Sequence, residues 1–189
     1  MDMFDGVGRR RDQSTGQLVS IGEFSLNGFE RDLLFRNNGD GSFSDVAYVN
    51  RSDRIEDGRG VSIFDYDADG RLDVLVRNYR QPAQLLRGVR DRGHWLRVKL
   101  VGTRSNRDAI GARVSVSSGG MRQTREVNAG SGFLSTSSRI QHFGLGSAAR
   151  ADTVDVRWPS GARTRLTDVA GNRVITIEEG ASVPPGEQP

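Results

Sequence analysis

Apolar and polar residues alternate over short stretches along most of the chain, with turns rich in glycine, asparagine and serine between them. Alternating runs of about four to eight residues are typical of β-strands with one buried face. No stretch shows the spacing of three and four residues that predicts an amphipathic helix. The pattern therefore predicts an all-β protein.

The first half of the chain predicts two pairs of strands. Residues 33–36 and 42–46 flank a turn of Asn, Gly and Asp residues that tolerate a positive φ, which predicts a hairpin. Residues 60–64 and 73–77 flank an aspartate-rich loop. We expect these two runs to be half-buried or buried strands on either side of that loop.

The second half predicts a β-sandwich or barrel. Residues 94–101 place Leu96, Val98 and Leu100 on one face of a strand. Glycine-rich turns separate the later strands at the short spacing of such folds. The later predicted strands are residues 112–117, 123–128, 140–143, 154–158, 163–166 and 174–177.

The loop between the second pair of strands has the composition of a calcium site. Ca²⁺ binds about six to eight hard oxygens, and Gly70 permits the positive φ of a tight turn. Four carboxylates this close together would repel each other without a cation. The predicted ligands are the carboxylates of Asp65, Asp67, Asp69 and Asp73 and the backbone carbonyl of Arg71.

Two other structures contain loops of similar composition, the EF-hand and the metal-free hairpin turn. An EF-hand needs flanking helices and a Glu at the twelfth position, where this chain has Val76, so an EF-hand is excluded. A metal-free hairpin turn remains the alternative, because Asp and Gly are common in turns.

The loop and the preceding hairpin resemble one FG-GAP or VCBS repeat. The resemblance is carried by residues 34–43, Gly60 and residues 64–73. In that family the repeats form the blades of calcium-bearing β-propellers. A propeller needs about four to eight blades, so the resemblance implies a single blade-like unit here.

The second half resembles the ASPIC/UnbV domain over about residues 94–179. The resemblance is carried by residues 102–103, 105–112, 130–134, 142–146 and 156–161. Such domains usually follow FG-GAP repeats, as in the cartilage acidic proteins and their bacterial relatives, and the family is often extracytoplasmic. UnbV itself is encoded in enediyne antibiotic clusters, which implies a role as an accessory to natural-product biosynthesis.

Pattern and resemblance together predict one blade-like calcium-loop unit packed on a β-sandwich or barrel. The predicted parts are a mobile segment at 1–23, the calcium-loop unit at 24–90, the sandwich at 94–179 and a disordered tail at 180–189. A lone blade leaves sheet edges unpaired. We therefore expect a monomer whose sandwich covers these edges, with a homodimer as the alternative.

Charge and composition limit the classes of partner and metal site that we expect. The net charge is +3, but arginines and acidic residues are interspersed along the chain, so we expect no nucleic acid partner. With no cysteine, a thiolate metal site or disulfide is excluded. No apolar stretch has the length of a membrane span, and residues 1–11 lack the apolar core of a signal peptide; the localisation stays open.

Candidate ligand-binding residues lie in the second half. The polar turn at Asn106, Arg107 and Asp108 could form a recognition loop with neighbours Arg125, His142 and Trp158, or it could be a structural turn that bonds its own backbone. Both histidines, His94 and His142, are expected to be structural.

We expect no catalytic residues. Ser131 or Ser135 with His142 and Asp108 could form a triad, but no Gly-x-Ser-x-Gly motif is present. The expected function is a calcium-stabilised binding or scaffold module for a small molecule, glycan or protein. The alternatives are a calcium-dependent enzyme, such as a cyclase or hydrolase, and an adhesion module for glycans or proteins.

Overall fold

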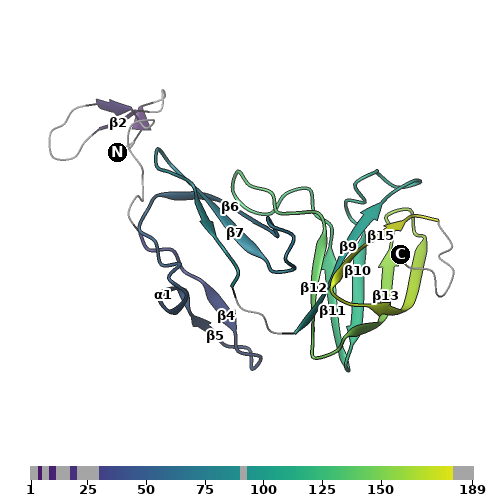
Figure 1. Cartoon of the computed structure of the whole chain (residues 1–189). Coiled ribbons are helices and arrows are strands. Elements are labelled where there is room, and N and C mark those ends of the chain that lie inside the picture. Colours follow the sequence, from purple (N-terminus) through teal and green to yellow (C-terminus); the bar gives the residue numbers. More distant parts are fainter. Residues whose placement is uncertain (1–3, 6–8, 12–17, 21–29, 90–92, 181–189) are drawn as a thin grey trace. The chain divides into compact units, whose positions relative to one another are not determined.

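The computed structural model describes residues 4–5, 9–11, 18–20, 30–89 and 93–180 (Figure 1). These residues form strands joined by turns, and the helix among them is the short α1 (Ala47–Asn50). The all-β prediction is confirmed. The chain divides into two compact units, one of Met1–Gly60 with Val76–Leu86 and one of Val61–Leu75 with Arg87–Pro189.

Five short strands open the first unit. Strands β1 (Phe4–Asp5), β2 (Arg9–Arg11) and β3 (Leu18–Ser20) form an antiparallel sheet. The rest of the predicted mobile segment at 1–23 lies outside the described residues. Strands β4 (Phe35–Asn37) and β5 (Phe43–Asp45) pair antiparallel, which confirms the predicted hairpin. Gly39 and Gly41 have positive φ values in its turn, as the sequence indicates.

A three-stranded sheet contains the aspartate-rich loop. Its strand order is β6 (Gly58–Phe64), β7 (Asp73–Asn78) and β8 (Gln84–Leu86). The predicted strands on both sides of the loop are therefore present. The division into compact units assigns residues 61–75 to the unit that contains the second half of the chain, whereas the sequence pattern places the boundary near residue 90.

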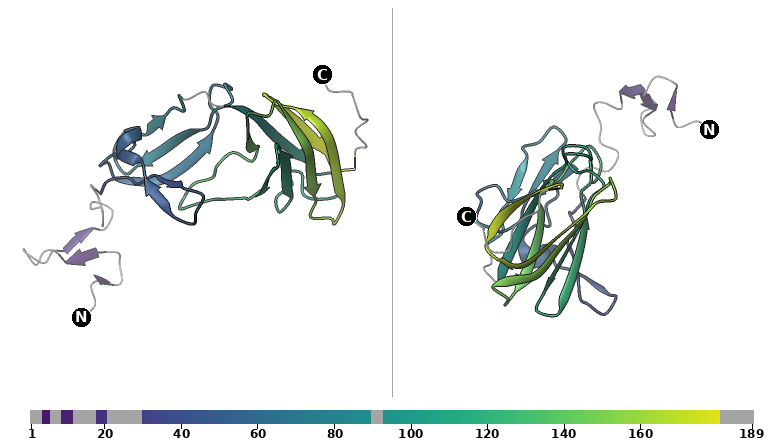
Figure 2. Two further views of the ribbon diagram at one scale, coloured as in Figure 1. Left: turned by 90° about the horizontal axis from the view of Figure 1, so that it is seen from below. Right: turned by 90° about the vertical axis from the view of Figure 1, so that its right-hand side faces the viewer.

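The second unit contains a β-sandwich (Figure 2). One sheet has the order β11-β10-β13-β14, and the other has the order β12-β9-β15, in which β15 runs parallel to β9. The strands are β9 (His94–Val101), β10 (Arg113–Ser118), β11 (Met121–Glu126), β12 (Gln141–Gly146), β13 (Arg150–Arg157), β14 (Arg163–Ala170) and β15 (Arg173–Glu178). The described part of the predicted tail ends at Gly180.

Apolar side chains from both sheets form the core of the sandwich. Leu96, Val98 and Leu100 are buried on one face of β9, as their alternation predicts. Trp158 is 1% exposed, and its indole Nε1 donates a hydrogen bond to Thr164 Oγ1 at 2.9 Å. The other large buried members of the core are Phe143, Ile177, Val114, Val116, Val127, Val154, Val156 and Val169.

Strand β11 begins two residues earlier than the sequence pattern indicates. Gly119 and Gly120 both have positive φ values, so the chain reverses direction over these two residues. Met121 then pairs directly with Ser118. The reversal places Arg122, which precedes the predicted strand, within β11.

A buried glutamate ties the end of the sandwich to the turn after β9. Glu179 is 3% exposed, and its carboxylate accepts hydrogen bonds from the backbone amides of Thr103, Arg104 and Ser105. Burial alone would raise the pKa of Glu179, but hydrogen bonds from the Ser160 hydroxyl and the Ser105 amide outweigh it and lower the pKa from 4.5 to about 2.

This carboxylate makes the stability of the sandwich depend on pH. Its pKa is lower in the folded than in the unfolded protein, so its contribution is complete above about pH 4.5 and is lost as the pH falls toward about 2. Glu179→Gln should therefore lower the melting temperature at pH 6 more than at pH 2.5. The exposed neighbour Glu178→Gln is the control, and a pH-independent loss in Glu179→Gln would contradict the assignment.

Candidate metal centre

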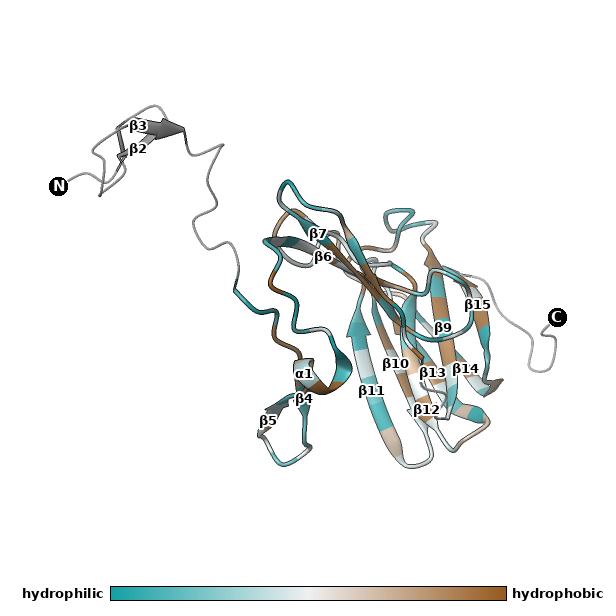
Figure 3. Ribbon diagram, turned by 60° about the vertical axis from the view of Figure 1, so that its left-hand side comes forward, coloured by the Kyte–Doolittle hydropathy of each residue, from teal (hydrophilic) through white to brown (hydrophobic). Residues whose placement is uncertain are grey.

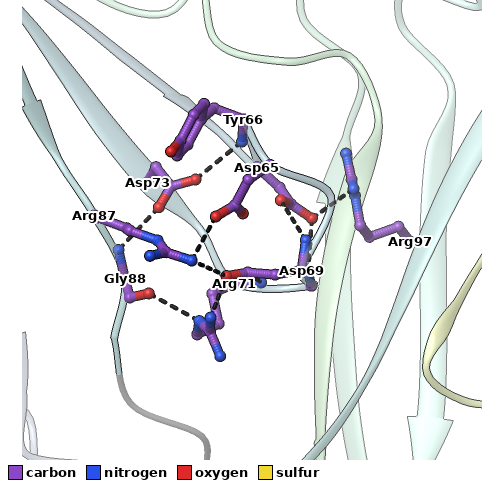
Figure 4. Close-up of polar contacts among 10 residues, drawn as sticks. Asp65, Tyr66, Asp69, Arg71, Asp73, Arg87, Gly88 and Arg97 are labelled. Carbon is purple, nitrogen blue, oxygen red and sulfur yellow. Dashed lines mark hydrogen bonds and ion pairs between the residues drawn. The ribbon is translucent and has the colours of Figure 1, made fainter.

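The loop between β6 and β7 is folded by its own aspartates (Figure 4). The carboxylate of Asp65 accepts hydrogen bonds from the amides of Asp69 at 3.1 Å and Gly70 at 2.9 Å. These bonds need a tight turn, and Gly70 supplies it with a φ of +87°. Asp65 thus holds the loop closed from its first position.

Asp73 closes the base of the same loop. It is fully buried, and its two carboxylate oxygens accept the amides of Tyr66 and Gly88, each at 2.9 Å. A buried carboxylate is stabilised by such backbone donors. The loop and the segment that follows β8 are therefore bonded to one side chain.

Three of the four predicted carboxylates come together. Asp65, Asp67 and Asp73 each offer one oxygen, and these oxygens all lie within 4.8 Å of one another. Two oxygens bound to one Ca²⁺ at about 2.3–2.6 Å are at most about 5 Å apart. The cluster therefore fits a single hard cation in both donor chemistry and spacing.

Asp69 makes other contacts in this structure. Its Oδ1 accepts the Arg71 amide at 2.8 Å, and its Oδ2 forms an ion pair with the Arg71 guanidinium. The Asp69 carboxylate and the Arg71 carbonyl remain predicted ligands.

Arginines balance the charge of the loop. Arg97 on β9 donates to Asp65 Oδ2 at 2.6 Å, and Arg87 pairs with Asp67 at 2.7 Å. Arg71 also donates to the carbonyl of Gly88 at 2.8 Å. Sequence reasoning missed Arg97 and Arg87, although an arginine between the apolar positions of β9 is a recognisable signal. Their guanidinium groups reduce the repulsion that the sequence alone attributes to the four carboxylates.

The loop packs directly on β9. A Cβ added at Gly70 would lie 2.1 Å from the Trp95 ring, so only glycine fits against that indole. Trp95 in turn stacks on His142, with ring centroids 6.2 Å apart. The loop is thus held on the sandwich by an ion pair and an aromatic contact.

The surroundings of His142 disfavour its protonated form. Burial lowers its pKa, and the positive charges of Arg125 and Arg97 lower it further, against an opposing effect of Asp65. Its Nδ1 is buried without a hydrogen-bond partner among the described residues. The imidazole contributes packing beside Trp95.

The polar turn has the contacts of a structural turn. The side chain of Asn106 forms two hydrogen bonds with the backbone of Ile110. Its Oδ1 accepts the Ile110 amide at 2.8 Å, and its Nδ2 donates to the Ile110 carbonyl at 2.9 Å. Asp108 pairs with Arg139 at 2.6 Å, and Arg107 is exposed. No described hydrogen bond or ion pair joins this turn to His142 or Arg125.

The remaining candidates lie elsewhere. Arg125 lies over the Phe143 ring at 5.5 Å, and Trp158 is in the core. Ser131 donates to Ser137 at 3.2 Å, and among the described residues neither Ser131 nor Ser135 bonds to His142. Within the same residues, no helix is long and apolar enough to cross a membrane.

Comparison with known proteins confirms both sequence resemblances. Residues 18–76 match the family model of the FG-GAP-like repeat, and residues 102–184 match that of ASPIC and UnbV. Cartilage acidic protein 1 from Homo sapiens is 35% identical over 143 residues, 70% of this chain and 21% of the relative. Its Mus musculus counterpart is 35% identical over 126 residues, 61% of this chain and 19% of the relative. The chain thus spans about a fifth of the length of these curated relatives.

Proposed function

Because the chain combines an FG-GAP-like repeat with an ASPIC and UnbV domain, we propose that it is a calcium-stabilised binding or scaffold module. The observation that supports this most is the cluster of Asp65, Asp67 and Asp73, whose oxygens lie within 4.8 Å of one another. A bound Ca²⁺ would supply positive charge at this point. The protein's own residues would hold the loop in place through Asp73, Arg97 and the contact of Gly70 with Trp95.

The polar side chains of the predicted recognition turn make contacts within the protein. Asn106 bonds to Ile110 of its own turn, and Asp108 pairs with Arg139 outside it. The biosynthetic role and the calcium-dependent enzyme rest on resemblance and on general chemistry, and no contact of the metal centre favours either of them.

Calcium should raise the melting temperature of the intact chain, because a ligand that binds only the native state stabilises it. At a calcium concentration about 100 times the dissociation constant, the gain is about 2.7 kcal/mol. Thermal unfolding of metal-free protein with and without millimolar Ca²⁺ measures it. Asp67→Ala should abolish the gain and leave the far-UV spectrum intact, because Asp67 is an exposed member of the cluster.

Asp152→Ala is the matched control, since Asp152 is an exposed aspartate of the same unit that lies outside the cluster. This variant should keep the full calcium response. The absence of a calcium-dependent shift in the unmodified protein, or an unchanged shift in Asp67→Ala, would exclude the proposed site.

A further inference from the structure

The outer face of the sheet β11-β10-β13-β14 is rich in arginine. Val114 and Val116 on β10 and Val154 and Val156 on β13 point into the core. Because side chains alternate along a strand, their neighbours point outward. Figure 3 shows the hydrophilic character of β11 at one edge of this sheet.

The strand register arranges these outward side chains in rows across the sheet. The first row runs Glu126, Arg113, Arg157, Arg163. The second runs Thr124, Ser115, Asp155, Arg165, and the third runs Arg122, Ser117, Thr153, Thr167.

The first row places like charges side by side. Arg113 on β10 lies opposite Arg157 on β13, and Arg157 lies opposite Arg163 on β14. Residues directly opposite each other have Cβ atoms about 4.5–5.5 Å apart, and like charges there destabilise a sheet. An anion bound over the row would relieve this repulsion.

The acids on this face do not neutralise it. Glu126 pairs with Arg113 at 2.9 Å, and Asp155 pairs with Arg165 at 2.5 Å. Five arginines against one glutamate and one aspartate leave an excess of three positive charges. Arg122, Arg157 and Arg163 form no ion pair among the described residues.

The face is also hollowed. A groove of about 580 Å³ is lined by arginines from all four strands together with Ser115, Thr124 and Asp155, the partner of Arg165. A second hollow of about 320 Å³ shares Arg113 and Arg157 with it. Guanidinium groups form paired hydrogen bonds to planar or tetrahedral oxyanions, and hydroxyl groups can bond to sugar hydroxyls.

We propose that this arginine groove binds a sulfated polysaccharide. Single-stranded nucleic acids are held largely by stacking on aromatic rings, and the outward rows contain no aromatic residue. Protein partners are usually anchored by buried aromatic side chains together with arginine, and the rows contain arginine without any aromatic residue. A chain of sulfate groups and hydroxyls matches both the arginines and the hydroxyl side chains.

This inference names a partner for the proposed binding role and rests on it, but it does not depend on the metal centre. The test is titration calorimetry of the full chain with a heparin octasaccharide, in chelator and again in calcium. Binding in both buffers is expected. If calcium does not raise the melting temperature but the octasaccharide binds, only the metal site is rejected. If calcium raises the melting temperature but the octasaccharide does not bind, only the arginine groove is rejected.

Arg157→Ser with Arg163→Ser should weaken binding by about tenfold or more, because two charge-assisted contacts are removed. It should also reduce the dependence of affinity on salt. Arg36→Ser with Arg54→Ser is the matched control, since both are exposed arginines of the first unit and the change in charge is the same. The control should bind within about twofold of the unmodified chain.

Two further measurements test binding in the arginine groove even if the double variant does not fold. Glu126→Gln removes an exposed acid and frees Arg113, so binding should tighten by a few-fold. Desulfated heparin should not bind. Equal losses in the two double variants, no tightening in Glu126→Gln, or equal affinity for single-stranded DNA or desulfated heparin would each overturn the proposal.

Discussion

Arg97→Ala should lower the free energy of unfolding by about 3–5 kcal/mol in calcium-free buffer, because removing one partner of a buried ion pair leaves the other charge uncompensated. Arg97 is 9% exposed, and the side chain of its partner Asp65 is fully buried. The two groups are 2.6 Å apart. Urea denaturation in the presence of chelator measures the loss.

Calcium should restore part of this stability. If Asp65 is a ligand, the cation supplies the positive charge that Arg97 provides in this structure, so the deficit of Arg97→Ala should shrink in millimolar Ca²⁺. Lys99→Ala, which removes an exposed cation from the same strand, should change stability by less than about 0.5 kcal/mol in either buffer. An identical deficit with and without calcium would separate Arg97 from the metal site.

Gly70→Ala should strongly destabilise the loop. The added methyl would lie 2.1 Å from the Trp95 ring, and the residue has a φ of +87°. The left-handed backbone costs about 1–2 kcal/mol and overpacking about 1–3 kcal/mol more. We therefore expect a total loss of about 2–5 kcal/mol in chemical denaturation, and a weaker calcium response.

Gly161→Ala separates the two causes. Gly161 has a φ of +88°, and an added Cβ there would meet nothing within 4 Å. Gly161→Ala should therefore lower the free energy of unfolding only by the backbone cost, about 1–2 kcal/mol. If both variants lowered the free energy of unfolding equally, the contact between Gly70 and Trp95 would not contribute to the packing of the loop on β9.

The local pattern of the sequence was enough to predict most strands. Alternation at Leu96, Val98 and Leu100 identified β9, and the turn around Gly39 and Gly41 identified the first hairpin. Both depend on neighbours in the chain, because the period of two and the need for positive φ are properties of the local backbone. The start of β11 was missed because two adjacent glycines make a shorter turn than the apolar pattern suggests.

The acidic cluster was predicted in part for the same reason. The spacing of the aspartates is local, so the sequence indicated a closed acidic loop, and the structure brings Asp65, Asp67 and Asp73 together. The local sequence does not predict the orientation of the Asp69 side chain. This orientation depends on Arg71 and Arg87, and the position of Arg87 beside the loop results from the fold of the segment after β8.

The sequence by itself determined the strands, the hairpin turns and the acidic loop, because each arises from residues that are close together in the chain. Only the tertiary structure decided that Arg97 is the counter-ion of Asp65 and that Trp95 covers Gly70. It also decided that Arg113, Arg157 and Arg163 form one row. Strand register sets these neighbours. Arg113 lies opposite Arg157 because β10 pairs with β13, and these two strands are not joined by a turn, so no local pattern specifies that pairing.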